Sequence, residues 1–333
     1  MLITNTKMQN HSFRTEIQMQ KAEQAINHAH SLLLIGSCFA ENMGEKLIKY
    51  KFPTRVNPFG ILFNPLSIAQ SLEILTDAFL FQENDLHFFN NEWISFFHHG
   101  KFSHPDKSIC LENINKKLIE SRTFLQKADL LILTLGTSIA YRYKGKVVAN
   151  CHKVPQNQFQ MQLLTIQDIV SELAKSIEKV RNINQNIPIL FTVSPVRYIK
   201  NNLTENTLSK SQLIVAVHEL LRQVKNSDYF PAYEIMMDDL RDYRFYNEDM
   251  IHPSPAAVDY IWNAFSYRYF HSETIQLNTL IDEIAAAKNH RLKNALSAES
   301  KRFKEEQLKK IQKIQCDYPH IGFEEEVRYF SEL

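Results

Sequence analysis

Apolar runs that end abruptly recur along the chain and predict buried parallel strands. Residues 32–35 are four aliphatic residues that run into Gly36, and residues 129–136 repeat the pattern and end at Gly136. Residues 187–194 form a third run, closed by Pro195, and residues 229–238 are a fourth candidate. A continuous apolar run has no polar face, so such strands lie in a sheet that is covered on both sides.

Between these runs, apolar residues recur at helical spacing. The spacing predicts helices at about 40–50, 66–81, 113–127, 165–180, 210–226 and 255–270. We expect residues 55–65 and 144–158 to be irregular, and residues 88–105 to form a hairpin or a long loop. Strands that alternate with long helical crossovers specify a parallel sheet. The chain is therefore predicted to hold a three-layer α/β/α domain over residues 25–272, after a lead-in at residues 1–24.

A charge-rich helical extension is predicted over residues 273–333. Leu277, Leu280, Ile281 and Ile284 fall on one helical face, which must pack against something apolar. We expect it to pack back on the core or on a second subunit, so the extension is a candidate contact for a homo-oligomer.

Composition excludes several classes of protein. The chain is 44% hydrophobic and its net charge is +1, so it can build a large core and has no excess charge to attract nucleic acid or an anionic membrane. No apolar run approaches the roughly 20 residues of a membrane span, and the first residues lack the apolar segment of a secretory signal. The four cysteines lie far apart, which is typical of free thiols in a reducing compartment. We expect a cytoplasmic protein.

The loop after the first predicted strand carries two candidate nucleophiles, Ser37 and Cys38. Ligands of open α/β sheets bind outside the carboxyl ends of strands, and a helix that starts there directs its free N–H groups into the same loop. A structural interpretation is equally open at this point, in which Cys38 is a buried apolar thiol at a packed strand end.

A second candidate motif, Asp249-x-x-His252, precedes the last core helix. A carboxylate three residues before a histidine can turn back on the imidazole, fix its tautomer and stabilise the imidazolium. A capping acid beside a surface histidine would give the same pattern. The motif becomes more specific in combination with a nucleophile in the loop after the first strand.

The order of these elements resembles that of the SGNH hydrolase superfamily, and the motifs resemble the GSCFA-domain family within it. The matching stretches are GSCFA at 36–40, FRTEI at 13–17, NPFGILFNP at 57–65, LTLGTSIAY at 133–141, NCHKVP at 150–155 and IHPSPAAVDYIW at 251–262. The resemblance implies a flavodoxin-like parallel sheet and chemistry on acyl groups.

Carried over residue by residue, the resemblance makes Cys38 the nucleophile, His252 the base and Asp249 its orienting carboxylate. Ser37 occupies the superfamily's aspartate position and is a second candidate nucleophile, which leaves the choice between Ser37 and Cys38 open. A thiolate at a helix N-terminus beside a histidine is an effective nucleophile, which favours Cys38.

The resemblance also implies an oxyanion hole and residues that line the substrate site. Gly60 and Gly136 match its glycines by order, and Ser138 stands where the superfamily has asparagine. A serine hydroxyl can still donate, although it is shorter, and Asn64 is a spare amide nearby in the sequence. Asn150 and His152 are further candidate substrate-lining residues.

Arg197 follows the third strand and reaches the same edge of the sheet, where it either binds an anionic substrate group or pairs with a carboxylate. A zinc alternative uses Cys and His side chains, although none of them has the close spacing of a typical zinc motif. Its candidate ligands are Cys38, Cys151, His98, His99, His104, His152 and His252.

The sequence therefore predicts an esterase or O-acyltransferase that works through an acyl-enzyme, without a cofactor or metal. A thioester is readily captured by a nucleophile other than water, which favours transfer to a hydroxyl of a small molecule or glycan. Two alternatives are a non-catalytic binding domain of the same fold and a zinc-dependent hydrolase. No nucleic acid or membrane partner is expected.

Overall fold

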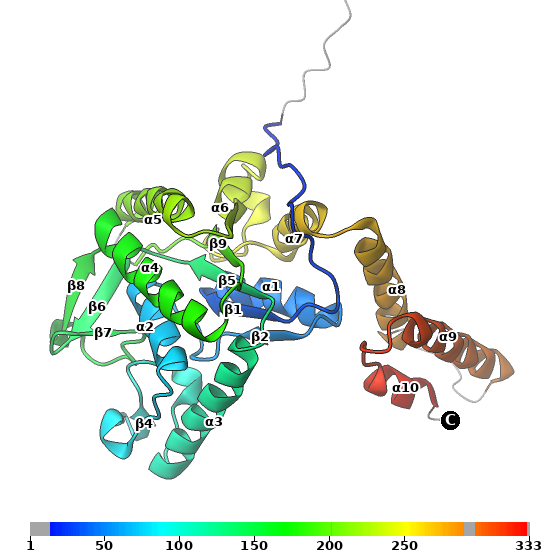
Figure 1. The fold of residues 1–333 in the computed structure, drawn as a ribbon, viewed down its shortest axis with the longest axis horizontal. Helices are drawn as coiled ribbons and strands as arrows, with labels where there is room; N and C mark the ends of the chain where they lie inside the picture. The colour runs from blue at the N-terminus through cyan, green and yellow to red at the C-terminus, as the bar shows by residue number, and fades with distance from the viewer. Residues whose placement is uncertain (1–13, 201, 290–296, 332–333) are drawn as a thin grey trace, which may run out of the picture.

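A five-stranded parallel sheet forms the centre of the computed structural model, which describes residues 14–200, 202–289 and 297–331 (Figure 1). The strands lie in the order β10-β9-β5-β1-β2. If the five strands are numbered 1 to 5 along the chain and read from the β2 edge, the order is 2-1-3-4-5, as in flavodoxin. The strand order therefore reverses between β1 and β5. The strands are β1 (Leu32–Gly36), β2 (Thr54–Val56), β5 (Leu130–Leu135), β9 (Ile189–Val193) and β10 (Ser227–Phe230).

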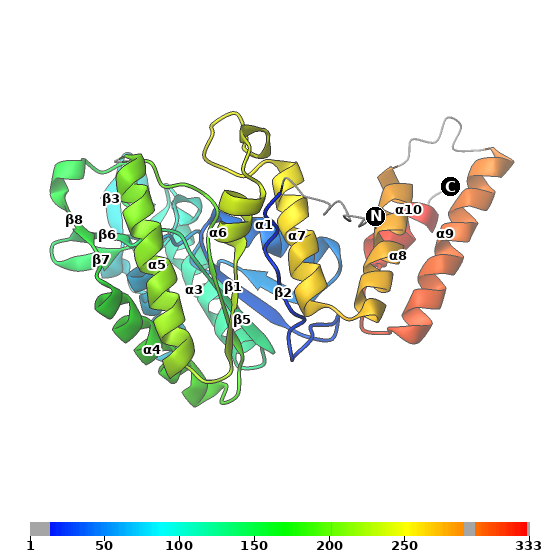
Figure 2. The same cartoon turned by 90° about the horizontal axis from the view of Figure 1, so that it is seen from above.

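Helices cover both faces of this sheet and complete the predicted three layers (Figures 1 and 2). Successive side chains of a strand point to opposite faces. Leu33 and Ile35 therefore pack against α2 (Pro65–Thr76), α3 (Lys107–Leu125), α4 (Ile166–Ile183) and α5 (Leu203–Gln223). Leu32 and Leu34 pack against α1 (Cys38–Lys49) and α7 (Pro255–Tyr269). Both apolar layers are fully buried at β1, which explains the uninterrupted aliphatic run.

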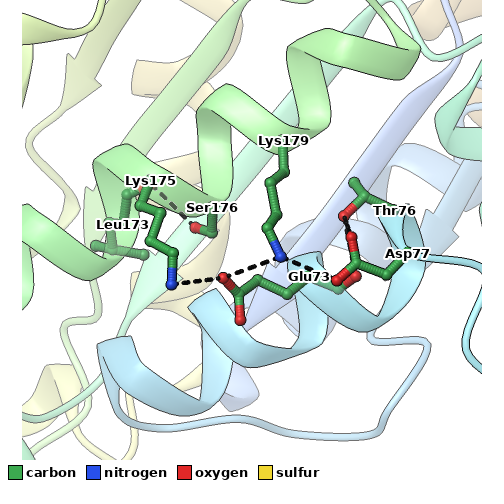
Figure 3. A network of polar contacts seen from close by, with 7 residues as sticks. All are labelled: Glu73, Thr76, Asp77, Leu173, Lys175, Ser176 and Lys179. Atoms are coloured by element: carbon green, nitrogen blue, oxygen red, sulfur yellow. Dashed lines mark hydrogen bonds and ion pairs between the residues drawn. The ribbon is translucent and has the colours of Figure 1, made fainter.

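Helices α2 and α4 pack side by side, and ion pairs line the edge of their contact (Figure 3). The Nζ atom of Lys179 lies 2.9 Å from Asp77 and 3.4 Å from Glu73, and Lys175 lies 3.3 Å from Glu73. Exposed pairs of this kind stabilise a fold by about 1 kcal/mol or less each. Burial of the apolar faces of the two helices, including Leu72 and Leu173, therefore contributes most of the stability of this contact.

Two small antiparallel sheets flank the main one. Strands β3 (His87–Phe89) and β4 (Glu92–Ile94) form the hairpin that was one of two expectations for residues 88–105. Strands β6 (Ile139–Tyr143), β7 (Lys146–Val148) and β8 (Phe159–Leu163) form a second sheet. The shorter elements are η1 (Glu83–Asp85), η2 (Gly100–Phe102), η3 (Gln156–Gln158), α6 (Ala232–Glu234), η4 (Ile235–Asp239) and η5 (Tyr243–Phe245).

Three sequence expectations are wrong in detail. Residues 55–65 are not wholly irregular, because Arg55 and Val56 belong to edge strand β2, which is too short and polar to show a period. Residues 144–158 include β7, which pairs with β6 across the two-residue turn Lys144–Gly145, where both residues have positive φ. The strand expected over 229–238 ends at Phe230, because Pro231 follows it and the apolar residues beyond continue as helical turns.

The C-terminal extension packs on the α1 side of the core, at one end of the molecule (Figures 1 and 2). It consists of α8 (Ser272–Asn289), α9 (Ala298–Asp317) and α10 (Glu324–Ser331). The hydroxyl of Tyr50 donates to Asp282 at 2.5 Å, and the Nζ atom of Lys51 lies 2.8 Å from Glu326. Packing on the core was one of the two expected outcomes, and the homo-oligomer stays a prediction.

The first 13 residues of the lead-in lie outside the described residues. Beyond them, the N–H of Ala22 donates to the carbonyl oxygen of Arg268 at 2.9 Å, so the lead-in is joined to the end of α7. No helix in the described part of the chain is long and apolar enough to cross a membrane.

Candidate functional site

The loop between β1 and α1 lies where strand order reverses, beside the carboxyl end of β5. Gly36 ends β1 with φ +151°, and a Cβ atom there would lie 2.1 Å from the carbonyl oxygen of Thr134. Only glycine therefore allows the chain to leave β1 this close to β5. The turn places Ser37 and Cys38 at the edge of the sheet where ligands of such folds bind.

Ser37 and Cys38 have different structural roles. Ser37 is 1% exposed and is the N-cap of α1, where its Oγ atom accepts a hydrogen bond from the N–H of Phe39 at 3.3 Å. Cys38 is the first residue of α1 and its side chain is partly exposed. The serine hydroxyl is thus engaged in capping the helix, whereas Cys38 is partly exposed.

Opposing effects act on the ionisation of Cys38. Burial is the largest effect and raises the pKa of the thiol above its ordinary value. The positive charge of Lys210 and the backbone N–H groups of Cys38 and Phe39, at the start of α1, lower that pKa. Glu41 raises it slightly further.

Lys210 lies in the interior behind this loop and projects from α5. It is 1% exposed, and its Nζ atom donates to the carbonyl oxygens of Gly136 at 2.6 Å and of Ser194 at 2.7 Å. These carbonyls belong to the loops that follow β5 and β9. Burial lowers the pKa of Lys210 to about 7, and the nearby Cys38 acts in the opposite direction.

His252 and Asp249 form the predicted pair on the loop before α7. The Nδ1 atom of His252 lies 2.6 Å from Oδ2 of Asp249, whose other oxygen accepts from the N–H groups of Ile251 and His252. These backbone bonds and the imidazole lower the pKa of Asp249 to about 2. The carboxylate is therefore ionised at neutral pH, and Nε2 of His252 is free of hydrogen bonds to the described residues.

Arg197 joins the loop after β9 to the loop of this pair. Its N–H donates to the carbonyl oxygen of Ile251 at 3.3 Å, and its guanidinium donates to the hydroxyl of Tyr246 at 3.2 Å. No carboxylate among the described residues pairs with it, and its buried Nε atom has no acceptor there. Of the two outcomes expected for Arg197, pairing with a carboxylate does not occur within the described ranges.

A family model for the GSCFA family matches residues 31–265, which include Ser37, Cys38, Arg197, Lys210, Asp249 and His252. The chain belongs to the GSCFA family. A second model, for the C-terminal domain of GSCFA domain proteins, matches residues 281–333 in the helical extension. No curated protein sequence matches the chain.

The predicted oxyanion residues of this GSCFA protein have partners within the chain. The N–H of Gly60 donates to the carbonyl of Asn57, and the N–H of Gly136 donates to the carbonyl of Phe63, both at 2.8 Å. Asn64 caps α2 through its Oδ1 atom and donates from Nδ2 to Ser67 at 3.0 Å. The hydroxyl of Ser138 donates to Gln212 at 2.8 Å. Their roles toward a substrate stay predictions.

Asn150 and His152 hold the loop after β7 against the segment after β4. The Oδ1 atom of Asn150 accepts from the N–H of His152 at 2.8 Å. The Nε2 atom of His152 contacts the carbonyl oxygen of Ser95 at 2.8 Å, so this nitrogen carries the proton. His98 is fully buried, stacks on Phe59 and bonds to the hydroxyl of Ser95.

No three His, Cys, Asp or Glu side chains gather into a metal-binding group within the described ranges. The ligand set that the zinc alternative needs is therefore not assembled there.

The sequence reasoning missed two residues of the site. Lys210 lies on the same helical face as Leu213, Val217 and Leu220. A lysine on an otherwise apolar face indicates a buried charge, so the sequence could have identified it. Asn57 is buried with φ +45° and its Oδ1 atom accepts from the N–H of Gly36 at 2.8 Å. Its Nδ2 atom is a buried donor with no acceptor in the part of the chain described, which no local sequence pattern indicates.

Proposed function

We propose that this GSCFA protein is an SGNH-type esterase or O-acyltransferase that works through an acyl-enzyme on Cys38. The observation that carries the proposal is the hydrogen bond between His252 and the ionised Asp249. A carboxylate in this position keeps the proton of the imidazole on Nδ1 and leaves Nε2 as a base. The loop that holds the pair is anchored by Ile251 to Arg197, at the end of β9.

In the first step, the Sγ atom of Cys38 attacks the carbonyl carbon of an ester and His252 takes the thiol proton on Nε2. The tetrahedral intermediate collapses, the carbon–oxygen bond breaks, and the alcohol leaves with that proton. In the second step, His252 deprotonates water or an acceptor hydroxyl, whose oxygen attacks the thioester carbon. The carbon–sulfur bond breaks, and Cys38 leaves as a thiol with the proton from His252. Asp249 stays ionised and stabilises the imidazolium in both steps.

Exposure supports Cys38 over Ser37 as the nucleophile. Ser37 is buried and its hydroxyl caps α1, so its use as a nucleophile would require the helix start to rearrange. Cys38 is partly exposed at the same helix start. A thiol also needs less activation than a hydroxyl, because its ordinary pKa is much closer to neutral.

Arg197 supports an anionic group on the substrate. A partly buried guanidinium without a carboxylate partner is costly, and its fork of donors matches a carboxylate or phosphate. Within the described ranges its side-chain donors reach Tyr246 and the sulfur of Met237. We therefore favour an acylated sugar or other small hydroxyl compound that also carries a negative charge.

The test is intact mass after a brief pulse with an activated short-chain ester. The native chain is compared with Cys38→Ala, Ser37→Ala and His252→Ala. We expect an added acyl mass that disappears with Cys38→Ala and His252→Ala and persists with Ser37→Ala. Loss only with Ser37→Ala would make the serine the nucleophile. Absence of an adduct on every chain would contradict the proposal and favour a non-catalytic binding domain.

A further inference from the structure

We propose that Lys210 is a positioning residue for the nucleophile Cys38. The buried amine of Lys210 controls how readily the thiol of Cys38 ionises. This inference rests on Cys38 being the nucleophile of the proposed function. Its test measures ionisation of the thiol directly and requires no acyl transfer, so the two proposals can fail separately.

The site that holds Lys210 accepts both forms of the amine. A neutral amine has two N–H groups, and the structure offers two acceptors, the carbonyl oxygens of Gly136 and Ser194. An ammonium has a third N–H, for which the described residues provide no further hydrogen bond. The ring of Tyr233, with its centroid 5.6 Å from Nζ, lies where it can stabilise the positive charge. Lys210 can therefore gain or lose a proton without losing its two anchors.

These anchors also fix the amine relative to the site. Gly136 follows β5 and Ser194 follows β9, so Lys210 joins two loops at the carboxyl edge of the sheet. A Cβ atom at Gly136 would lie 3.3 Å from the Cβ atom of Ser37, so the anchored amine lies directly behind the loop that carries Cys38. A lysine on the surface would spread its charge over many rotamers and be screened by water. Here the charge is held in one place inside the protein, where screening is weak.

Few charges among the described residues act on the pair. The charges of Lys210 and Glu41 shift the pKa of Cys38, and the charge of Cys38 shifts the pKa of Lys210. Tyr233, which lies beside the amine, in turn faces Arg197, Glu234, Asp238 and Tyr246. Because the coupling between the thiol and the amine is reciprocal, a charged Lys210 favours the thiolate and the thiolate favours a charged Lys210.

The consequence is a nucleophile whose activation depends on a proton at Lys210. Burial opposes ionisation of Cys38, and the positive amine offsets part of that cost. Because burial also lowers the pKa of Lys210 to about 7, this help weakens as the pH rises through neutrality. His252 still takes the thiol proton in the proposed reaction, and the positive charge of Lys210 makes that transfer easier by stabilising the thiolate.

The first test is the rate of alkylation of Cys38 by iodoacetamide as a function of pH, read by peptide mass. Lys210→Met keeps the length of the side chain and removes the charge. We expect alkylation of Cys38 at pH 7 to slow about tenfold, equivalent to a rise of about one pKa unit. Exposed Cys316 is the control within the same chain and should keep its rate. An unchanged rate at Cys38, with buried Cys110 still protected, would overturn the proposal.

The second test needs no change at Lys210 and decides the matter if Lys210→Met exposes Cys110 by unfolding. The native chain is alkylated in parallel with iodoacetate, which is anionic, and iodoacetamide, which is neutral. A positive amine attracts the anionic reagent and loses its charge as the pH rises. The rate with iodoacetate divided by the rate with iodoacetamide at Cys38, normalised to the same ratio at Cys316, should therefore fall severalfold from pH 6 to pH 8. The same fall is expected in His252→Ala. A flat ratio, or a fall that disappears in His252→Ala, would contradict the role of Lys210.

Discussion

The Nδ1 atom of His252 lies 2.6 Å from the Oδ2 atom of Asp249, and the other carboxylate oxygen accepts two backbone N–H groups of the same turn. The side chain of Asp249 thus holds its own turn by hydrogen bonds and orients the imidazole of His252. Because the pKa of Asp249 is lowered to about 2, this orientation holds throughout the ordinary range of pH.

Asp249→Asn tests this orientation. The amide keeps the shape of the carboxylate but cannot hold the imidazole proton on Nδ1 or balance an imidazolium. We expect the rate of acyl-adduct formation to fall about 10²- to 10⁴-fold, because catalytic triads slow by up to about 10⁴-fold when an amide replaces their carboxylate. Circular dichroism checks the fold, and Asp242→Asn, on an exposed turn nearby, is the matched control. An adduct rate within twofold of the native chain would exclude Asp249 from the mechanism.

Ser37→Ala and Cys38→Ala should separate stability from chemistry. Loss of the Ser37 cap is expected to lower the free energy of unfolding by about 1 kcal/mol while the adduct still forms. Cys38→Ala should abolish the adduct and leave α1 capped. Urea denaturation and intact mass measure the two effects. The opposite pattern, an adduct lost with Ser37→Ala, would reverse the assignment of the two residues.

Arg197→Met should affect anionic substrates selectively. We expect adduct formation from an activated monoester of succinate to slow at least tenfold, because the guanidinium no longer meets the free carboxylate. The matching neutral butyrate ester should react at nearly the native rate. Equal slowing of both esters would indicate instead that the guanidinium supports the His252 loop through Tyr246, which bridges to Pro253, and does not bind the substrate.

Stability should fall in mild acid because two buried histidines are held neutral. Burial lowers the pKa of His28 to about 4 and that of His98 to about 3. Below about pH 6.5 the unfolded chain gains protons at these side chains while the folded chain does not. Each should therefore lower the free energy of unfolding by about 1 kcal/mol between pH 6.5 and 5.5. Urea denaturation at the two pH values measures this, and His28→Gln should reduce the loss.

Glu326→Gln should loosen the C-terminal helices. Glu326 is 8% exposed and pairs with Lys51, so its loss leaves a half-buried cation unpaired, at a cost of about 2 kcal/mol. Hydrogen exchange should increase in α10 and remain unchanged in α5. Glu325→Gln is the matched control, because the carboxylate of Glu325 is exposed where it pairs with Lys288. Equal exchange in the two variants would show that the ion pair does not hold the extension in place.

The sequence by itself determined the features that depend on near neighbours. The aliphatic run of β1, its end at Gly36 and the start of α1 follow from local periodicity and from the freedom of glycine. The contact of Asp249 with His252 spans three residues and one turn, so spacing alone was enough to predict it. The family match rests on the same local motifs.

Only the tertiary structure decided which groups meet across the fold. Lys210 reaches Gly136 over 74 positions of sequence, and no carboxylate among the described residues packs against Arg197. No local pattern records either relationship. Edge strand β2 forms because β1 offers it a row of backbone partners. Packing of the loop after β1 buries Ser37 as the cap of α1 and leaves Cys38 partly exposed. Burial and charge belong to the assembled core, so they emerge only when distant segments pack together.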